Sequence, residues 1–194
     1  MSADWFVKTR GRSNKEDYTW FPVGTVRQAD PETLAERGCQ GRSWDSLIDD
    51  EKPGMLLFDD RHYGTVLLVT GLISSDHPVD YQHRTIRAAL LGTARPGHDS
   101  EQRALVAVAA AALRDELAAK LPVRYGAAQG VEIDAHSWAR FAEETAGQLS
   151  ERPELHPTAD EFKIRPDTKD DLQQTADSLG TLYLRSGPDA ISSG

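Results

Sequence analysis

The stretch GMLLFDDRHYGTVLLVTGLISSDHPVDYQHRTIRAALLGT, residues 54–93, decides the fold. It contains three apolar runs of strand length, MLLF (55–58), TVLLVTGL (65–72) and RTIRAALLGT (84–93). Short runs of β-branched or large apolar side chains, bounded by Gly, Pro or Asp, are typical of strands. Their short polar connections predict a three-strand antiparallel meander. The continuous apolar character of 65–72 predicts that this strand is central in the sheet.

The N-terminal region shows the alternation of a β-hairpin. DWFVKTR (4–10) places Trp5 and Val7 on one face of a strand, and YTWFPV (18–23) alternates again up to Pro22. We expect the two strands to pair and to extend the meander, with Pro22 favouring an edge position. The aromatic side chains of the hairpin are interpreted as core and cross-strand packing rather than as a platform for bases or peptides.

The sequence predicts four helices. An opening Pro31, an early Glu32 and a closing Gly38 indicate the helix at 31–38, and helical spacing of apolar residues indicates those at 43–51, 100–121 and 135–149. The last two are the longest, and each has an inward stripe of apolar side chains. The sequence therefore predicts an α+β fold with a mainly antiparallel sheet, built from the N-terminal hairpin and the central three-strand meander. The two long helices are expected on one face of this sheet, and the other face is expected to be open. A further short strand is predicted at 131–133.

A change in composition divides the chain into a domain and an arm. Residues 1–149 are predicted to form a single α+β domain, which at this size needs neither disulfide nor metal to fold. Residues 150–194 are rich in Pro and in charged side chains, which predicts a partly extended C-terminal arm. Within the arm, TLYLR (181–185) has the pattern of a short strand or docking segment.

Composition excludes several classes of protein. The chain of 194 residues has a formal net charge of −9 and a sequence pI of about 5.1, so bulk charge does not favour nucleic acid or anionic lipid as a partner. A single cysteine, Cys39, excludes an intramolecular disulfide. With no signal sequence and no apolar stretch of membrane length, the chain is expected to be cytoplasmic. Its preference for Arg over Lys is typical of a high-GC bacterium. The common nucleotide-binding, hydrolase and metalloprotease motifs are absent, and no cofactor is predicted.

The connection between the second and third strands is rich in ionisable side chains. It gathers two acids, two histidines and two arginines: Asp76, His77, Asp80, His83, Arg84 and Arg87. Histidine and aspartate are ligands that zinc accepts, but their spacing here matches no known metal motif. No metal site is therefore predicted.

Alternation through the third strand suggests where its basic side chains lie. His83, Thr85 and Arg87 are predicted on the open face of the sheet, where Arg87 is suited to binding a carboxylate or a phosphate. We prefer an internal pairing in which Asp80 holds the loop to Arg84 or Arg87. The alternative is that His83, Arg84, Arg87 and Asp80 form a partner-binding surface, and these are the candidate site residues of the domain.

The C-terminal arm contains a motif of its own. Ser-Leu-Gly-Thr-Leu-Tyr-Leu-Arg, residues 178–185, is similar to the short targeting peptides of encapsulin cargo proteins, which have the pattern S-L-G-x-x-x-L-R. The resemblance implies that the C-terminal segment targets the protein to a larger assembly. The rest of the chain does not resemble those cargo proteins. An edge strand, or a segment that docks on its own domain, is the preferred interpretation. The candidate partner-binding residues of the arm are Leu182, Tyr183, Leu184 and Arg185.

Three functional hypotheses follow. The first is a non-enzymatic interaction or adaptor subunit of a multicomponent bacterial system, of the defence or conflict type. Such a subunit would bind a protein partner or a second copy through the open sheet face and the C-terminal arm. The second is an enzyme or small-molecule-binding domain that uses residues 76–87. The third is a structural or cargo-type component addressed by its C-terminal segment. Because no catalytic residue is predicted, we favour the first.

Overall fold

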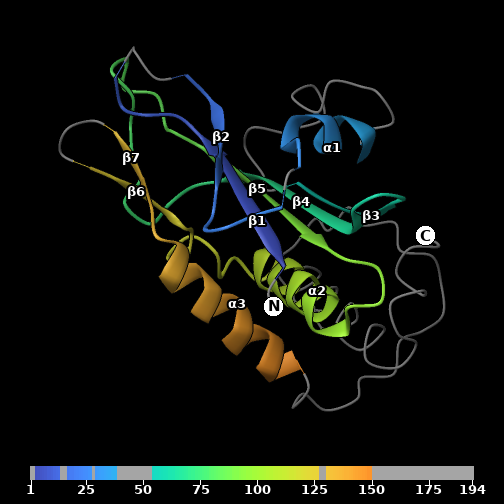
Figure 1. Cartoon of the computed structure of the whole chain (residues 1–194). Helices are drawn as coiled ribbons and strands as arrows, with labels where there is room; N and C mark the ends of the chain where they lie inside the picture. The colour runs from blue at the N-terminus through green and yellow to red at the C-terminus, as the bar shows by residue number, and fades with distance from the viewer. Residues whose placement is uncertain (1–2, 14–16, 28, 39–53, 127–129, 150–194) are drawn as a thin grey trace.

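The computed structural model of the chain describes residues 3–13, 17–27, 29–38, 54–126 and 130–149. These residues form a five-stranded sheet, a two-stranded sheet and three helices (Figure 1). The large sheet has the strand order β2-β1-β5-β4-β3, and every neighbouring pair is antiparallel. Its strands are β1 (Asp4–Thr9), β2 (Thr19–Pro22), β3 (Met55–Asp60), β4 (Gly64–Leu72) and β5 (Ala88–Ala94). The predicted α+β class is confirmed.

Both predicted groups of strands are present, and one pairing joins them. β3, β4 and β5 form the meander, while β1 and β2 form the hairpin with Pro22 in an edge strand. The join is the pairing of β1 with β5, in which Trp5 lies opposite Gly92. A Cβ atom at Gly92 would lie 2.5 Å from the ring of Trp5, so only glycine leaves room for the indole. β4 is an interior strand, as its apolar run predicts, but β5 holds the middle position.

Two helices cover one face of the sheet, as predicted. They are α2 (Asp99–Leu113) and α3 (Ala135–Leu149), and they pack on side chains from alternate strand positions. The buried strand residues on this face include Trp5, Val7, Leu67, Val69 and Leu90. Trp138 of α3 meets Trp5 edge to face, with ring centroids 5.1 Å apart. None of the helices in the described residues combines the length and the apolar character needed to span a membrane.

The opposite face, which the sequence predicts to be open, is covered by α1 (Pro31–Gly38). The buried side chains of this layer are Leu34 and Ala35 of the helix with Phe6, Val66, Leu68, Ala89 and Leu91 of the strands. Glu32, in the first turn, pairs with Lys8 of β1 at 3.0 Å. Arg37, in the last turn, pairs with Asp60 of β3 at 2.9 Å. The sequence predicts this helix at the correct residues, but nothing in its pattern indicates the face that it covers.

α2 ends at Leu113 and not at residue 121 as predicted. Asp115 follows with a φ of 61°, and the N–H groups of Asp115 and Glu116 donate back to carbonyls of the last helical turn. A residue in the left-handed conformation, most often glycine, commonly ends a helix in this way. Leu117 continues the helical spacing and is buried, which explains why the sequence pattern runs past the true end.

Other boundaries also differ from the predicted ones. The third strand begins at Ala88 and not at residue 84, and the short strand β7 (Val131–Ile133) pairs with β6 (Val123–Tyr125), which the sequence pattern does not indicate. The second long helix, α3, occupies the predicted residues. The predicted helix at 43–51 and the C-terminal arm, 150–194, lie outside the described residues.

A buried carboxylate fixes the start of α2 to the sheet. Glu101, in the first turn of α2, is 1 % exposed and forms a salt bridge with Arg95, which directly follows β5. It accepts hydrogen bonds from the backbone N–H and from Nε of Arg95, each at 2.9 Å. Burial alone would raise the pKa of Glu101, but the side-chain and backbone hydrogen bonds from Arg95 lower it below its ordinary value. The carboxylate therefore stays ionised and ties the helix to the middle strand.

Candidate functional site

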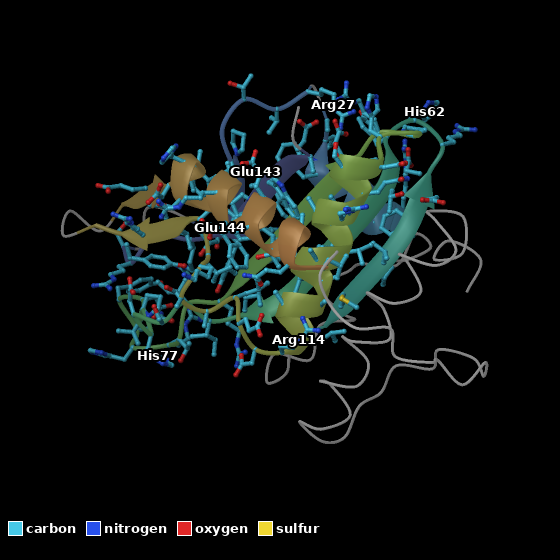
Figure 2. The ribbon with its side chains drawn as sticks, turned by 90° about the horizontal axis from the view of Figure 1, so that it is seen from below. Arg27, His62, His77, Arg114, Glu143 and Glu144 are labelled. Atoms are coloured by element: carbon cyan, nitrogen blue, oxygen red, sulfur yellow. The ribbon has the colours of Figure 1, made fainter. Side chains whose placement is uncertain are left out.

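The loop of residues 73–87 connects β4 to β5 at one end of the sheet. The turn between β3 and β4 lies at the other end, because the two strands are antiparallel. Figure 2 shows this separation, with His77 of the loop and His62 of the turn at opposite ends of the molecule. The loop is therefore a site distinct from the polar turn.

Two residues of the loop have a left-handed backbone. His77 has a φ of 44° and His83 a φ of 62°, a region that is uncommon for residues other than glycine. The N–H of His77 donates to the carbonyl of Ser74 at 2.9 Å, and the N–H of His83 donates to that of Asp80 at 3.0 Å. Such conformations persist where surrounding contacts enforce them, and they concentrate at functional sites.

Asp80 organises the loop. It is 5 % exposed, and its carboxylate accepts hydrogen bonds from the backbone N–H groups of Gln82 at 2.8 Å and Arg84 at 2.9 Å. The guanidinium of Arg84 adds contacts through Nε at 2.9 Å and Nη2 at 2.7 Å, and Nη1 of Arg10 lies 3.6 Å away. Burial alone would raise the pKa of Asp80, but the hydrogen bonds from Arg84 and Gln82 lower it to about 2. The predicted pairing of Asp80 with Arg84 is present, and it makes this carboxylate a structural anion rather than a general base.

Arginine and exposed apolar side chains meet beside this carboxylate. The guanidinium carbon of Arg10 lies 5.7 Å from the ring centroid of Tyr18 and 5.9 Å from that of Tyr81. Tyr18, Val79 and Tyr81 are 42 %, 42 % and 51 % exposed, and they are the large apolar side chains that the described residues expose. The side chain of Arg84 is 60 % exposed. Arg10, Tyr18, Val79, Tyr81 and Arg84 are named here the Arg–Tyr surface.

The other candidate residues lie beside this surface or outside the described residues. His83 is exposed on the loop. Arg87 is half-buried, and its Nη1 donates to the carbonyl of Gly71 at 3.4 Å while its backbone N–H donates to the hydroxyl of Tyr18 at 3.4 Å. Arg87 therefore joins β4 and the hairpin and does not pair with the loop carboxylate. The arm candidates Leu182, Tyr183, Leu184 and Arg185 lie outside the described residues.

The acids and histidines of the loop do not converge on one point. Among the described residues, no three side chains of the types His, Cys, Asp and Glu lie close enough together to hold a metal ion. Asp76 and His77 are exposed, whereas Asp80 is buried behind its arginine partner. The arrangement offers a firmly held surface of Tyr and Arg, the residue types that are enriched at interaction hot spots.

A groove of about 850 Å³ lies elsewhere, between α2, α3 and the beginning of β1. Trp5 and Trp138 line it together with alanines of α3, and its charged side chains are Asp99, Arg103 and Glu143, the last labelled in Figure 2. No residue of the 73–87 loop lines this groove. The predicted small-molecule site built from loop residues is therefore not located in it.

Sequence patterns do not identify Arg10 and Tyr81 as site residues, and the preferred interpretation of Tyr18 is packing within the hairpin, whereas its side chain is 42 % exposed. Arg10 and Tyr18 flank the strands of the N-terminal hairpin, and only the pairing of β1 with β5 brings them beside the loop. The one local signal is the presence of Val79 and Tyr81 in the largely polar middle of the loop, residues 74–85. Such residues indicate either a buried anchor or an exposed contact, and the structure shows the second.

Comparison with known proteins identifies no matching family model, no similar curated protein and no similar solved structure. What supports a function is the chemistry of the Arg–Tyr surface itself. That surface combines exposed aromatic rings, guanidinium groups and a loop that Asp80 holds in place.

Proposed function

We propose that this protein is a non-enzymatic interaction or adaptor subunit of a multicomponent system in the bacterial cytoplasm, and that its Arg–Tyr surface binds a protein partner. The observation that carries the proposal is the exposure of Tyr18, Val79 and Tyr81 beside two arginines. Tyrosine and arginine contribute a large share of the binding free energy at many protein interfaces. The candidate residues of the C-terminal arm add a second contact.

The loop is suited to binding because its conformation is already fixed. Asp80 binds two backbone N–H groups of its own loop, and Ile86 donates across the loop to the carbonyl of Pro78 at 2.8 Å. Ordering a loop on binding reduces affinity, so a loop that is ordered beforehand avoids that cost. The contact between Arg10 and the rings of Tyr18 and Tyr81 fixes the aromatic side chains in the same way.

Charge suggests the chemistry of the partner. Two guanidinium groups, those of Arg10 and Arg84, lie beside one carboxylate, that of Asp80, so the three groups together carry one positive charge. The side chain of Arg10 is 12 % exposed and that of Arg84 is 60 % exposed, so Arg84 presents this charge to solvent. The chain as a whole carries a net charge of −9, so this local charge is opposite in sign to the net charge of the chain. A partner that offers an apolar patch with an acidic group at its rim is complementary to it. This replaces the open sheet face as the proposed contact, because α1 covers that face.

The test is a capture experiment with the full chain as bait in source cells, followed by a binding assay with the purified partner. The variant Tyr18→Ala/Tyr81→Ala removes both rings, and Arg61→Ala/His62→Ala makes an equal number of exposed changes at the other end of the molecule. We expect the parent and the control to bind one stoichiometric partner. The double tyrosine variant is expected to bind it about 30-fold more weakly, corresponding to roughly 2 kcal/mol for the loss of a hot spot.

Two results would contradict the proposal. One is an unchanged dissociation constant for the tyrosine variant, which would place the contact elsewhere on the molecule. The other is that parent, variant and control, all folded by circular dichroism, capture no stoichiometric partner. Equal thermal unfolding of the three proteins is required, so that a loss of binding is not a loss of fold.

A further inference from the structure

β3 is an edge strand of the sheet, and among the described residues only β4 pairs with it. Gly54 and Thr70 exchange both backbone hydrogen bonds, at 3.3 Å and 2.8 Å, which sets the alternation of bonded residues along β3. The residues whose N–H and C=O groups point away from β4 are therefore Met55, Leu57 and Asp59. Each of them offers a donor and an acceptor to a further strand.

This edge lacks the features that usually discourage strand addition. Residues 55–58 are four consecutive large apolar residues, all half-buried, and β3 contains neither Pro nor Lys. The other edge strand, β2, has only four residues and ends at Pro22, which has no N–H to donate. Long apolar edges readily accept another strand, and proteins commonly cover them. The edge at β3 is therefore the one that calls for a covering segment.

We propose that the chain's own residues 181–185, Thr-Leu-Tyr-Leu-Arg, add to β3 as a sixth strand. The segment is apolar at three successive positions, and it begins 32 residues after Leu149, where α3 ends. A connection of this length can extend over about 110 Å, which exceeds the width of a domain of this size. The segment can therefore reach β3 from the end of α3.

Its attachment to the domain favours this segment over a separate molecule. A single added strand of five residues buries far less than the roughly 1,200 Å² that a stable intermolecular interface requires. A tethered segment, however, meets its site at an effective concentration of about millimolar, so a weak contact is sufficient. A second copy of the chain lacks this advantage at β3. While the segment lies on β3, a partner that binds residues 182–185 first has to displace it.

Charge suggests the direction of the added strand. Asp59 is exposed on the edge, and Arg185 is the one charged residue of the segment. A parallel arrangement with Tyr183 level with Leu57 places Arg185 level with Asp59. In that register the N–H of Leu57 donates to the carbonyl of Leu182, and its C=O accepts from the N–H of Leu184.

The test is amide hydrogen exchange of the full chain, followed by NMR at single residues. The outward amides of Leu57 and Asp59 report on the added strand, whereas the inward amides of Leu56 and Phe58 report on the pairing with β4. We expect the outward amides to exchange about tenfold more slowly than exposed ones, and the variant Leu182→Pro/Leu184→Pro to remove that protection. The matched control Ile191→Pro/Ser193→Pro keeps it, and the inward amides stay protected in all three proteins.

Three outcomes would overturn the inference. The outward amides exchange as fast as exposed ones in the parent, or their protection survives Leu182→Pro/Leu184→Pro because another segment covers the edge. The third is protection that grows with protein concentration, which would identify a second copy as the occupant. The register has its own test: Arg185→Asp weakens protection, and the exchange Asp59→Arg/Arg185→Asp restores it. Failure to restore it contradicts the parallel register. None of these results depends on the Arg–Tyr surface.

Discussion

The middle strand, β5, is flanked by two arginine–carboxylate pairs that have the same chemistry but connect different parts of the structure. Asp80–Arg84 precedes the strand and Arg95–Glu101 follows it. Both carboxylates are buried, and in both the hydrogen bonds from the arginine keep the pKa low despite burial. Asp80 and Arg84 are four residues apart in one loop, whereas Glu101 belongs to α2 and joins that helix to the sheet.

The parts of the structure that each pair connects determine its role. Arg95–Glu101 connects two layers of the core, so its loss separates elements that the fold requires to be together. Asp80–Arg84 fixes the shape of a loop at the rim and leaves the arginine side chain 60 % exposed. The same chemistry therefore stabilises the fold at one end of β5 and presents a surface at the other.

The largest effect is expected from Glu101→Gln, which tests whether this pair holds the layers together. The variant removes the buried negative charge that pairs with Arg95, which is expected to lower the free energy of unfolding by roughly 2–3 kcal/mol. Urea unfolding followed by circular dichroism measures it. Glu144→Gln, an exposed position on α3, is the control and is expected to change stability by less than about 0.5 kcal/mol. An equal effect of the two variants would contradict a structural role for the pair.

A smaller, pH-dependent effect is expected from Asp80→Asn. The folded-state pKa of Asp80, about 2, lies below its ordinary value of 3.8, so its ionised form favours folding above that value. This contribution disappears as the pH falls through the folded pKa. The variant is therefore expected to be less stable than the parent near neutral pH and to lose less stability between about pH 5 and about pH 2. Urea midpoints over that range measure the difference, and parallel curves for the two proteins would show that Asp80 makes no such contribution.

The smallest effect on stability is expected from Arg84→Ala. Asp80 keeps the backbone hydrogen bond from Gln82 and the nearby Arg10, so the urea midpoint is expected to stay within error of the parent. The exposed guanidinium is nevertheless lost from the Arg–Tyr surface. Affinity for the captured partner is therefore expected to fall about tenfold, with Arg61→Ala as the unaffected control. A large loss of stability would show that this pair, too, supports the fold.

Local patterns predict the elements of the fold, and long-range contacts explain what they miss. Alternation in residues 4–10 is a period-two signal, and the runs 55–58 and 65–72 are continuous apolar stretches of strand length. Neither signal needs knowledge of the neighbouring strands. The position of α1 is missed because its eight residues indicate a buried side but not the layer that buries it. The early end of α2 is missed because Asp115, and not glycine, takes the left-handed position.

The candidate site also combines local contacts that the sequence predicts with long-range contacts that it does not. The pairing of Asp80 with Arg84 is predictable, because opposite charges four residues apart in one loop have few other partners. Arg10 and Tyr18 are not, because they reach the loop only through the pairing of β1 with β5. The expected position of His83 and Arg87 on a strand is wrong for a local reason: the left-handed conformation of His83 delays the strand until Ala88.

The pairing of β1 with β5 also has a consequence for how the chain matures during translation. Asp4 pairs with Thr93, so the N-terminal hairpin cannot join the rest of the sheet until about 90 further residues have been made. At a synthesis rate of about 5–20 residues per second, Trp5 and Phe6 therefore remain for several seconds without β5, the strand with which they pair. The nascent hairpin is therefore expected to be a target for chaperones that hold apolar segments near the ribosome. Contacts so distant in sequence also slow folding, so the sheet is expected to close late.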